Sequence, residues 1–178
     1  MHEANQEAMP YVQAAQEQEL SPFCLDAINL SNDLGSRGLY QEAARVLRLV
    51  IDHDSSHPIA YYNQAHWFSM HADFSAAVNA YQASLQLQPL NPCAWGSLGY
   101  ALARLGRHLE AIHAYTQSLQ QHPTEGAIFY LRSVSLFLAD DTKAALADLD
   151  SALSLKAIPQ PSLIQSILDT DQERTRNP

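Results

Sequence analysis

The chain has 178 residues, of which 47% are hydrophobic and 16% are charged, as in ordered proteins. Its formal net charge is −9, and only two of its ten basic residues are lysines, Lys143 and Lys156. Nucleic-acid binding depends on a stripe of basic side chains along the phosphates. Because the chain is acidic and has few basic residues, we expect no nucleic acid among its partners.

The beginning of the chain, residues 1–23, is a polar leader rich in Gln and Glu. It lacks the apolar segment of a secretory signal, and no run in the chain approaches the roughly 18 apolar residues of a membrane span. We therefore expect a cytoplasmic protein with no membrane span, whose leader is either a short helix or disordered. Ser21 followed by Pro22 is typical of a helix start, with Ser21 as the N-cap.

From residue 24 to residue 159 the residues recur with a period of 34. Alanines mark this period at four positions and aromatic residues at three, namely Ala43, Ala77, Ala111 and Ala145, and Tyr61, Trp95 and Phe129. A fixed period of this size indicates stacked supersecondary units rather than one globular core. Four units exceed the roughly three that such a stack needs, so we expect one elongated domain.

The third unit resembles the tetratricopeptide repeat, and the residues that carry the resemblance are Trp95, Leu98, Gly99, Leu102, Gly106, Glu110, Ala111, Tyr115 and Pro123. The resemblance implies an all-α fold, a right-handed superhelical solenoid of four helix-turn-helix repeats over residues 24–57, 58–91, 92–125 and 126–159. The fourth unit departs most from the pattern. It has Arg132, Asp140 and Ala157 where an apolar residue, glycine and proline are usual.

Each unit needs small residues where its two helices cross, because small side chains let the backbones approach. The small residues in phase are Ser31, Ala65, Gly99 and Ser133. We expect the alanine of the second helix to face them, so that Ala111 lies against Gly99.

Each unit also needs a turn between its helices. Gly38 and Gly106 can end the first helix in the left-handed region without steric cost. Asp140 tolerates that region moderately and Ala72 poorly. We therefore expect the second turn to be strained or differently built.

After the fourth unit, Ser162 can cap a segment whose apolar residues Leu163, Ile164, Ile167 and Leu168 fall on one face. Residues 160–178 are therefore predicted to form an amphipathic capping helix with a frayed tail, which shields the last repeat.

In a solenoid of paired helices, the first helix of every unit lines the concave side, and residues outside the inter-helix seam face the groove. We predict an aromatic and aliphatic groove with Arg104 as its only permanent charge. Such a lining suits an extended or helical peptide with apolar anchors. The predicted peptide-binding residues are Ile28, Asn32, Ile59, Tyr62, His66, Met70, Tyr100, Arg104, Tyr130, Val134 and Phe137.

Two alternatives concern this groove. Tetratricopeptide domains that bind the acidic C-terminal tails of heat-shock proteins use a clamp of basic and polar residues. Here Asn32 and Asn63 match it, but Ile28, Cys93 and Ser97 replace the rest, so the sequence argues against that activity.

The second alternative is intramolecular. The leader or the C-terminal helix can cover the apolar stripe of Tyr130, Val134 and Phe137, since covering such a stripe avoids aggregation.

The titratable residues form no predicted catalytic or metal site. His53 and His57 straddle a turn and have no second pair in a fixed relation to them, whereas a structural zinc site needs four ligands. We interpret the histidines as solvated, with the exception of His66. From its place in the groove, His66 could sense pH or donate a hydrogen bond to the backbone of a bound peptide. The carboxylates are interpreted as a solvated face, namely Asp140, Asp141, Asp148 and Asp150.

The two cysteines, Cys24 and Cys93, fall near the starts of units that are two repeats apart. That spacing places their Cα atoms beyond the roughly 7 Å limit for a disulfide. We expect free thiols that act as small packing residues.

The sequence thus predicts a non-enzymatic module without a cofactor or metal, which binds a protein or peptide in its concave groove as an adaptor or chaperone. One alternative is a type III secretion translocator chaperone. The chain resembles such chaperones in size and layout and in the sequence segments 38–52 and 106–115. Another is a structural adaptor that assembles oligomers, including a homodimer, through its convex face or its caps.

Overall fold

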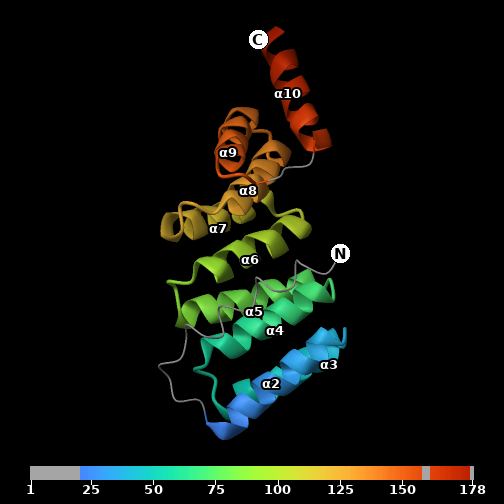
Figure 1. Cartoon of the computed structure of the whole chain (residues 1–178), viewed down its shortest axis with the longest axis vertical. Coiled ribbons are helices and arrows are strands. Elements are labelled where there is room, and N and C mark those ends of the chain that lie inside the picture. Colours follow the sequence, from blue (N-terminus) through green and yellow to red (C-terminus); the bar gives the residue numbers. More distant parts are fainter. Residues whose placement is uncertain (1–20, 158–160, 177–178) are drawn as a thin grey trace.

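The computed structural model describes residues 21–157 and 161–176, and within these residues the regular structure is entirely helical (Figure 1). The first unit begins with α2 at Pro22, and the rest of the predicted leader, residues 1–20, lies outside the described residues. The helices are α2 (Pro22–Ser36), α3 (Tyr40–His53), α4 (Pro58–Met70), α5 (Phe74–Leu87), α6 (Pro92–Arg104), α7 (His108–Gln121), α8 (Gly126–Leu138), α9 (Thr142–Ser154) and α10 (Pro161–Arg176).

Each helix packs mainly against the one before it and the one after it, and the stack rises from α2 at one end to α10 at the other (Figure 1). The strongest packing lies within the pairs α2–α3, α4–α5, α6–α7 and α8–α9. The all-α solenoid of four helical hairpins followed by a C-terminal helix, as predicted from the sequence, is confirmed.

Local sequence explains where the helices begin. Pro58 and Pro92 occupy the first turn of α4 and α6, where a missing N–H costs nothing. The hydroxyl of Ser21 accepts a hydrogen bond from the N–H of Cys24, so its predicted role as an N-cap is confirmed. Asn91 caps α6 in the same way through its Oδ1 atom, 3.0 Å from the amide nitrogen of Ala94.

The four turns between paired helices share one backbone conformation. Gly38, Ala72, Gly106 and Asp140 have φ angles of 79°, 63°, 75° and 70°. Ala72 therefore takes the left-handed conformation like its glycine counterparts. The second turn is built like the others but carries the steric cost of a Cβ atom in that region.

At the crossing of α6 and α7, the side-chain atoms nearest to Gly99 belong to Tyr115. A Cβ atom at Gly99 would lie 2.6 Å from ring atoms of Tyr115, whose side chain is fully buried. Ala111 is buried too, but the aromatic ring one turn further along α7 occupies the space beside Gly99. Glycine is needed at position 99 because the Cβ atom of any other residue would collide with the ring of Tyr115.

Two residues that were expected to be solvated are buried. Asp148 on α9 has a side chain only 9% exposed, because it pairs with Arg132 on α8. His57 precedes α4 and is also buried, with its Nε2 atom 3.3 Å from Oδ2 of Asp54. The prediction of a uniformly solvated set of histidines and carboxylates is therefore wrong at these positions.

Both cysteines are free, as expected, but only Cys24 is a packing residue. Cys24 is fully buried against Ile28 and Leu47 in the first unit, whereas Cys93 is exposed. In the part of the chain that the structure describes, no helix has the length and apolar character needed to cross a membrane.

Candidate functional site

A cavity of about 630 Å³ opens on the side of the stack formed by α4, α6 and α8, the first helices of the second, third and fourth units. We call it the groove cavity. Its lining includes three of the predicted peptide-binding residues, His66, Met70 and Tyr100, together with Cys93, Ile128 and Leu131. The structure therefore brings aromatic and aliphatic side chains from three units to one hollow.

Small and buried residues shape the wall of the groove cavity. Gly96 on α6 faces α8, and a Cβ atom there would lie 2.8 Å from Cδ1 of Ile128. Tyr81 from α5 lies behind the first helices and is almost fully buried. Burial raises the pKa of Tyr81, and the neighbouring Tyr62 raises it further, so this phenol stays neutral.

Arg104, at the last position of α6, is held beside the groove cavity by two aromatic residues. Its Nη1 atom donates to the hydroxyl of Tyr100 at 2.8 Å, and its guanidinium carbon lies 4.3 Å from the ring centroid of Phe74. The rings of Phe74 and Tyr100 meet edge to face at 6.1 Å. Hydrogen bonding and the cation–π contact thus fix the position of an exposed positive charge.

Burial shifts the pKa of two further ionisable groups in this lining, His66 and Cys93. Burial lowers the pKa of His66, whose ring lies edge to face with Trp67 at 4.8 Å, so its neutral form is favoured. Burial raises the pKa of the Cys93 thiol, and the negative charge of Glu125 raises it further. Cys93 is therefore held in the thiol form and is a poor nucleophile.

Some predicted groove residues lie elsewhere. Ile28 is 2% exposed in the core between α2 and α3, and Ile59 is also buried, so neither faces an open groove. Tyr62 packs edge to face on Tyr81 at 5.7 Å and is half-buried. Asn32, in the first unit, is half-buried outside the described lining of the groove cavity.

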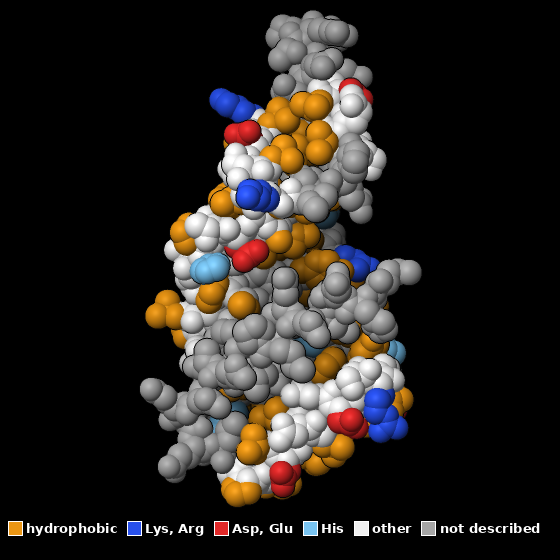
Figure 2. All heavy atoms as spheres, viewed as in Figure 1, with side chains coloured by type: hydrophobic (Ala, Val, Ile, Leu, Met, Phe, Trp, Pro, Cys, Tyr) orange, Lys and Arg blue, Asp and Glu red, His pale blue; other side chains and the backbone are white. Residues whose placement is uncertain are grey.

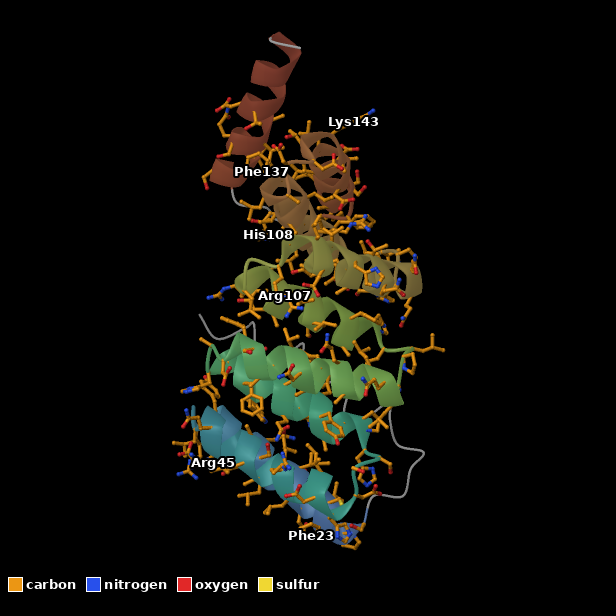
Figure 3. All side chains as sticks on the ribbon, turned by 180° about the vertical axis from the view of Figure 1, so that it is seen from behind. Phe23, Arg45, Arg107, His108, Phe137 and Lys143 are labelled. Carbon is orange, nitrogen blue, oxygen red and sulfur yellow. The ribbon has the colours of Figure 1, made fainter. Side chains whose placement is uncertain are left out.

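The fourth-unit residues of the prediction are divided between two environments. Tyr130 and Phe137 pack against a cluster that contains Leu149 of α9 and Ile167 of α10. Figure 3 shows Phe137 where α8 approaches the lower end of α10, and Figure 2 shows hydrophobic side chains gathered where α9 and α10 meet. Packing against α9 and α10 therefore leaves Tyr130 and Phe137 partly buried, and Val134 is half-buried as well.

Sequence reasoning missed the residues that the loop before α8 contributes. Glu125 and His122 both line the groove cavity, so the expectation that Arg104 is the only permanent charge there is wrong. Helical phase on the first helices could not reveal them, because they lie outside those helices. The one signal that could have found Glu125 is its position 34 residues after Asn91, the residue that caps α6.

A second hollow, the outer cavity, lies on the other face of α6 and has a volume of about 640 Å³. Trp95, Leu98 and Leu102 line it, and they point away from Cys93 and Tyr100 by helical spacing. Leu109 on α7 borders it and is 76% exposed. Apolar surface is therefore present on both sides of the third unit.

Comparison with known proteins identifies the class. The tetratricopeptide repeat family matches residues 71–125, which run from the second turn to the end of the third unit. Together with the helical hairpins of the fold, this match shows that the chain contains tetratricopeptide repeats.

Among curated proteins, the chain is similar to the peroxisomal targeting signal receptors of Eremothecium gossypii, at 32% identity over 91 residues, and of Saccharomyces cerevisiae, at 31% over 86 residues. These matches cover 51% and 48% of the chain but only 16% and 14% of the receptors. The matched part thus spans about a sixth of the length of these relatives.

Among solved structures, the chain is similar in fold to MamA. A crystal structure of MamA has a TM-score of 0.72 at 20% identity, with 82% of this chain and 83% of that one covered. MamA from Desulfovibrio magneticus RS-1, residues 41 to the end, has a TM-score of 0.73 at 19% identity, with 76% of each chain covered. At this level of identity the likeness concerns the fold alone.

Proposed function

We propose that this chain is a non-enzymatic protein–protein interaction module, which binds an apolar peptide segment of a partner in the groove cavity. The observation that carries the proposal is the convergence of Met70, Tyr100 and Ile128, from three successive units, on one hollow of about 630 Å³. Pockets of this size, lined by aromatic and aliphatic side chains with few polar groups, suit apolar anchors of a ligand.

Two further observations support a peptide rather than a small metabolite as the ligand. The lining is drawn from a row of parallel first helices, which offers an elongated surface. The matched peroxisomal proteins are named as receptors of a targeting signal, and recognition of a segment of another protein is the activity proposed here.

The test begins with the full chain as affinity bait, followed by mass spectrometry to identify the partner and calorimetric titration of the purified pair. Tyr100→Ala should weaken the complex by about 1–4 kcal/mol, as loss of a buried aromatic anchor does. The matched control is Leu109→Ala, which removes an exposed side chain beside the outer cavity. Equal affinity of wild type and Tyr100→Ala would contradict binding in the groove cavity.

A structural adaptor that uses the convex side is the second candidate, and the outer cavity with the exposed Leu109 favours it. In that case Leu109→Ala should weaken the complex and Tyr100→Ala should not. The same titrations therefore separate the two candidates. Assembly into a homodimer and a role as a type III secretion chaperone stay predictions from the sequence.

A further inference from the structure

Two opposite charges lie near the two ends of α6, the middle helix of the groove cavity. Glu125 lines it beside Cys93, near the first turn of α6, and its carboxylate is close enough to influence that thiol. Arg104 ends α6 and hydrogen-bonds to Tyr100, which also lines the cavity. Glu125 therefore belongs to the lining near the start of α6, whereas Arg104 stands beside the cavity at the end of α6.

Neither charge is neutralised within the described part of the chain. Arg104 has no carboxylate oxygen within 4.0 Å there, and its contacts are with the hydroxyl of Tyr100 and the rings of Phe74 and Tyr100. Glu125 has His122 as its ion-pair partner at 3.7 Å, a pair that exists only when His122 is protonated. Among the described residues, Arg104 and Glu125 form no ion pair with each other, and they lie near opposite ends of α6.

The length of α6 sets their separation. From Cys93 to Arg104 the helix rises about 16 Å, at 1.5 Å per residue. An extended peptide covers that distance with about five residues, at roughly 3.3 Å each. A bound segment that carried an anionic side chain at one end and a cationic one at the other could therefore meet both charges while its middle lay against the apolar lining.

We propose that the groove cavity selects a partner segment of this kind and fixes its direction, with an acidic side chain at Arg104, a basic side chain at Glu125 and apolar residues between them. The proposal rests on the proposed function of the groove cavity. Arg104 suits this role because its guanidinium is already positioned by Tyr100 and Phe74 and keeps donors for a carboxylate. Opposite charges at the two ends make one direction of the peptide favourable and the reverse repulsive, which gives specificity more than affinity.

The charge pattern points to another protein rather than to the leader of this chain. Residues 1–20 contain four glutamates, Glu3, Glu7, Glu17 and Glu19, but neither lysine nor arginine. They could supply an anion for Arg104 and no permanent cation for Glu125. The leader therefore lacks the charge pattern of the proposed segment.

The experiment is a selection of linear octapeptides displayed on phage against the full chain, with the wild type and the Arg104→Glu, Glu125→Lys double variant selected in parallel. The double variant keeps the net charge of the chain and reverses the two ends of the groove cavity. Arg107→Glu is the control, because Arg107 is exposed, pairs with Glu110 and does not line the cavity. Thermal unfolding followed by circular dichroism checks that each protein is folded, and Arg104→Gln replaces the double variant if that one unfolds.

We expect the wild type and Arg107→Glu to enrich peptides with an acidic and a basic residue about four to six positions apart, in one sequence order. The double variant should enrich the opposite order. Synthetic peptides from the wild-type selection should bind the double variant at least about tenfold more weakly in fluorescence anisotropy, since both charge contacts become repulsive. Arg104→Gln should lose only the preference for the acidic residue and keep the preference for the basic one.

Two results would overturn the proposal. Charge-directed binding would be wrong if the enriched peptides lacked the paired charges, or if the double variant enriched the same order as the wild type. In that case, loss of binding in Tyr100→Ala would still support peptide binding in the groove cavity. If no peptide were enriched, or if binding were unchanged in Tyr100→Ala, the proposed function would fail together with this inference.

Discussion

Arg132 on α8 and Asp148 on α9 form a two-point ion pair in the interior of the fourth unit. The Nε and Nη2 atoms of Arg132 lie 2.6 and 2.8 Å from the two carboxylate oxygens, and the side chains are only 19% and 9% exposed. Nη1 of Arg132 also donates to the hydroxyl of Thr116 on α7 at 3.0 Å. One arginine therefore joins both helices of the fourth unit to the second helix of the third.

Removal of Asp148 should destabilise the protein strongly. Asp148→Ala leaves the guanidinium of Arg132 partly buried without its counter-charge, a change that costs about 3–5 kcal/mol in such pairs. Urea unfolding followed by circular dichroism measures this loss. Asp33→Ala is the control, because it breaks an exposed pair with Arg37 and should cost much less. Similar losses in the two variants would contradict a structural role for the buried pair.

The strained second turn offers a stabilising change. Ala72 has a φ angle of 63°, where glycine avoids the steric cost of the Cβ atom, so Ala72→Gly should raise the free energy of unfolding by up to about 1 kcal/mol. Ala83→Gly, the same substitution within α5, should instead lower it by about 1 kcal/mol. A shift of the urea midpoint in the same direction for both variants would show that the turn conformation does not control the outcome.

The repeat period carries most of the information on the fold. Residues 34 apart have equivalent positions in successive hairpins, so the period alone locates the turn positions Gly38, Ala72, Gly106 and Asp140. The conformation of Ala72 is harder to anticipate. Its local preference argues for a different turn, whereas the geometry shared by all four hairpins prevails over it.

The candidate site is less accessible to sequence reasoning. Helical phase locates Met70 and Tyr100 on the side of the stack that carries the groove cavity. It does not measure depth, so it also selects Ile28 and Ile59, which are buried. Glu125 was missed because it comes from a loop. The pairing of Arg132 with Asp148 was missed as well. Each residue was interpreted alone, Arg132 as a departure from the repeat pattern and Asp148 as part of a solvated face.

Stability should also depend on the protonation of His66. Burial lowers its pKa below the ordinary value of about 6.5, so the unfolded state binds a proton more readily than the folded state. Its contribution to stability is therefore present above about pH 6.5 and is lost as the pH falls toward the lowered pKa of the folded protein. Urea unfolding at about pH 7.5 and at about pH 5.5 should show a smaller loss on acidification for His66→Gln than for wild type. An equal loss in both proteins would contradict this prediction.

The two glycines of α6 that face other helices should respond differently to a methyl group. At Gly99 a Cβ atom would lie 2.6 Å from the ring of Tyr115, which is fully buried and has no room to move, so Gly99→Ala should overpack the contact and cost about 1–3 kcal/mol. At Gly96 the nearest atom is the flexible end of Ile128, which can shift toward the groove cavity. Gly96→Ala should therefore be close to neutral, since alanine also favours the helix by about 1 kcal/mol. Urea unfolding of the two variants decides between them, and a Gly99→Ala protein as stable as Gly96→Ala would mean that α6 and α7 can separate to admit the methyl group.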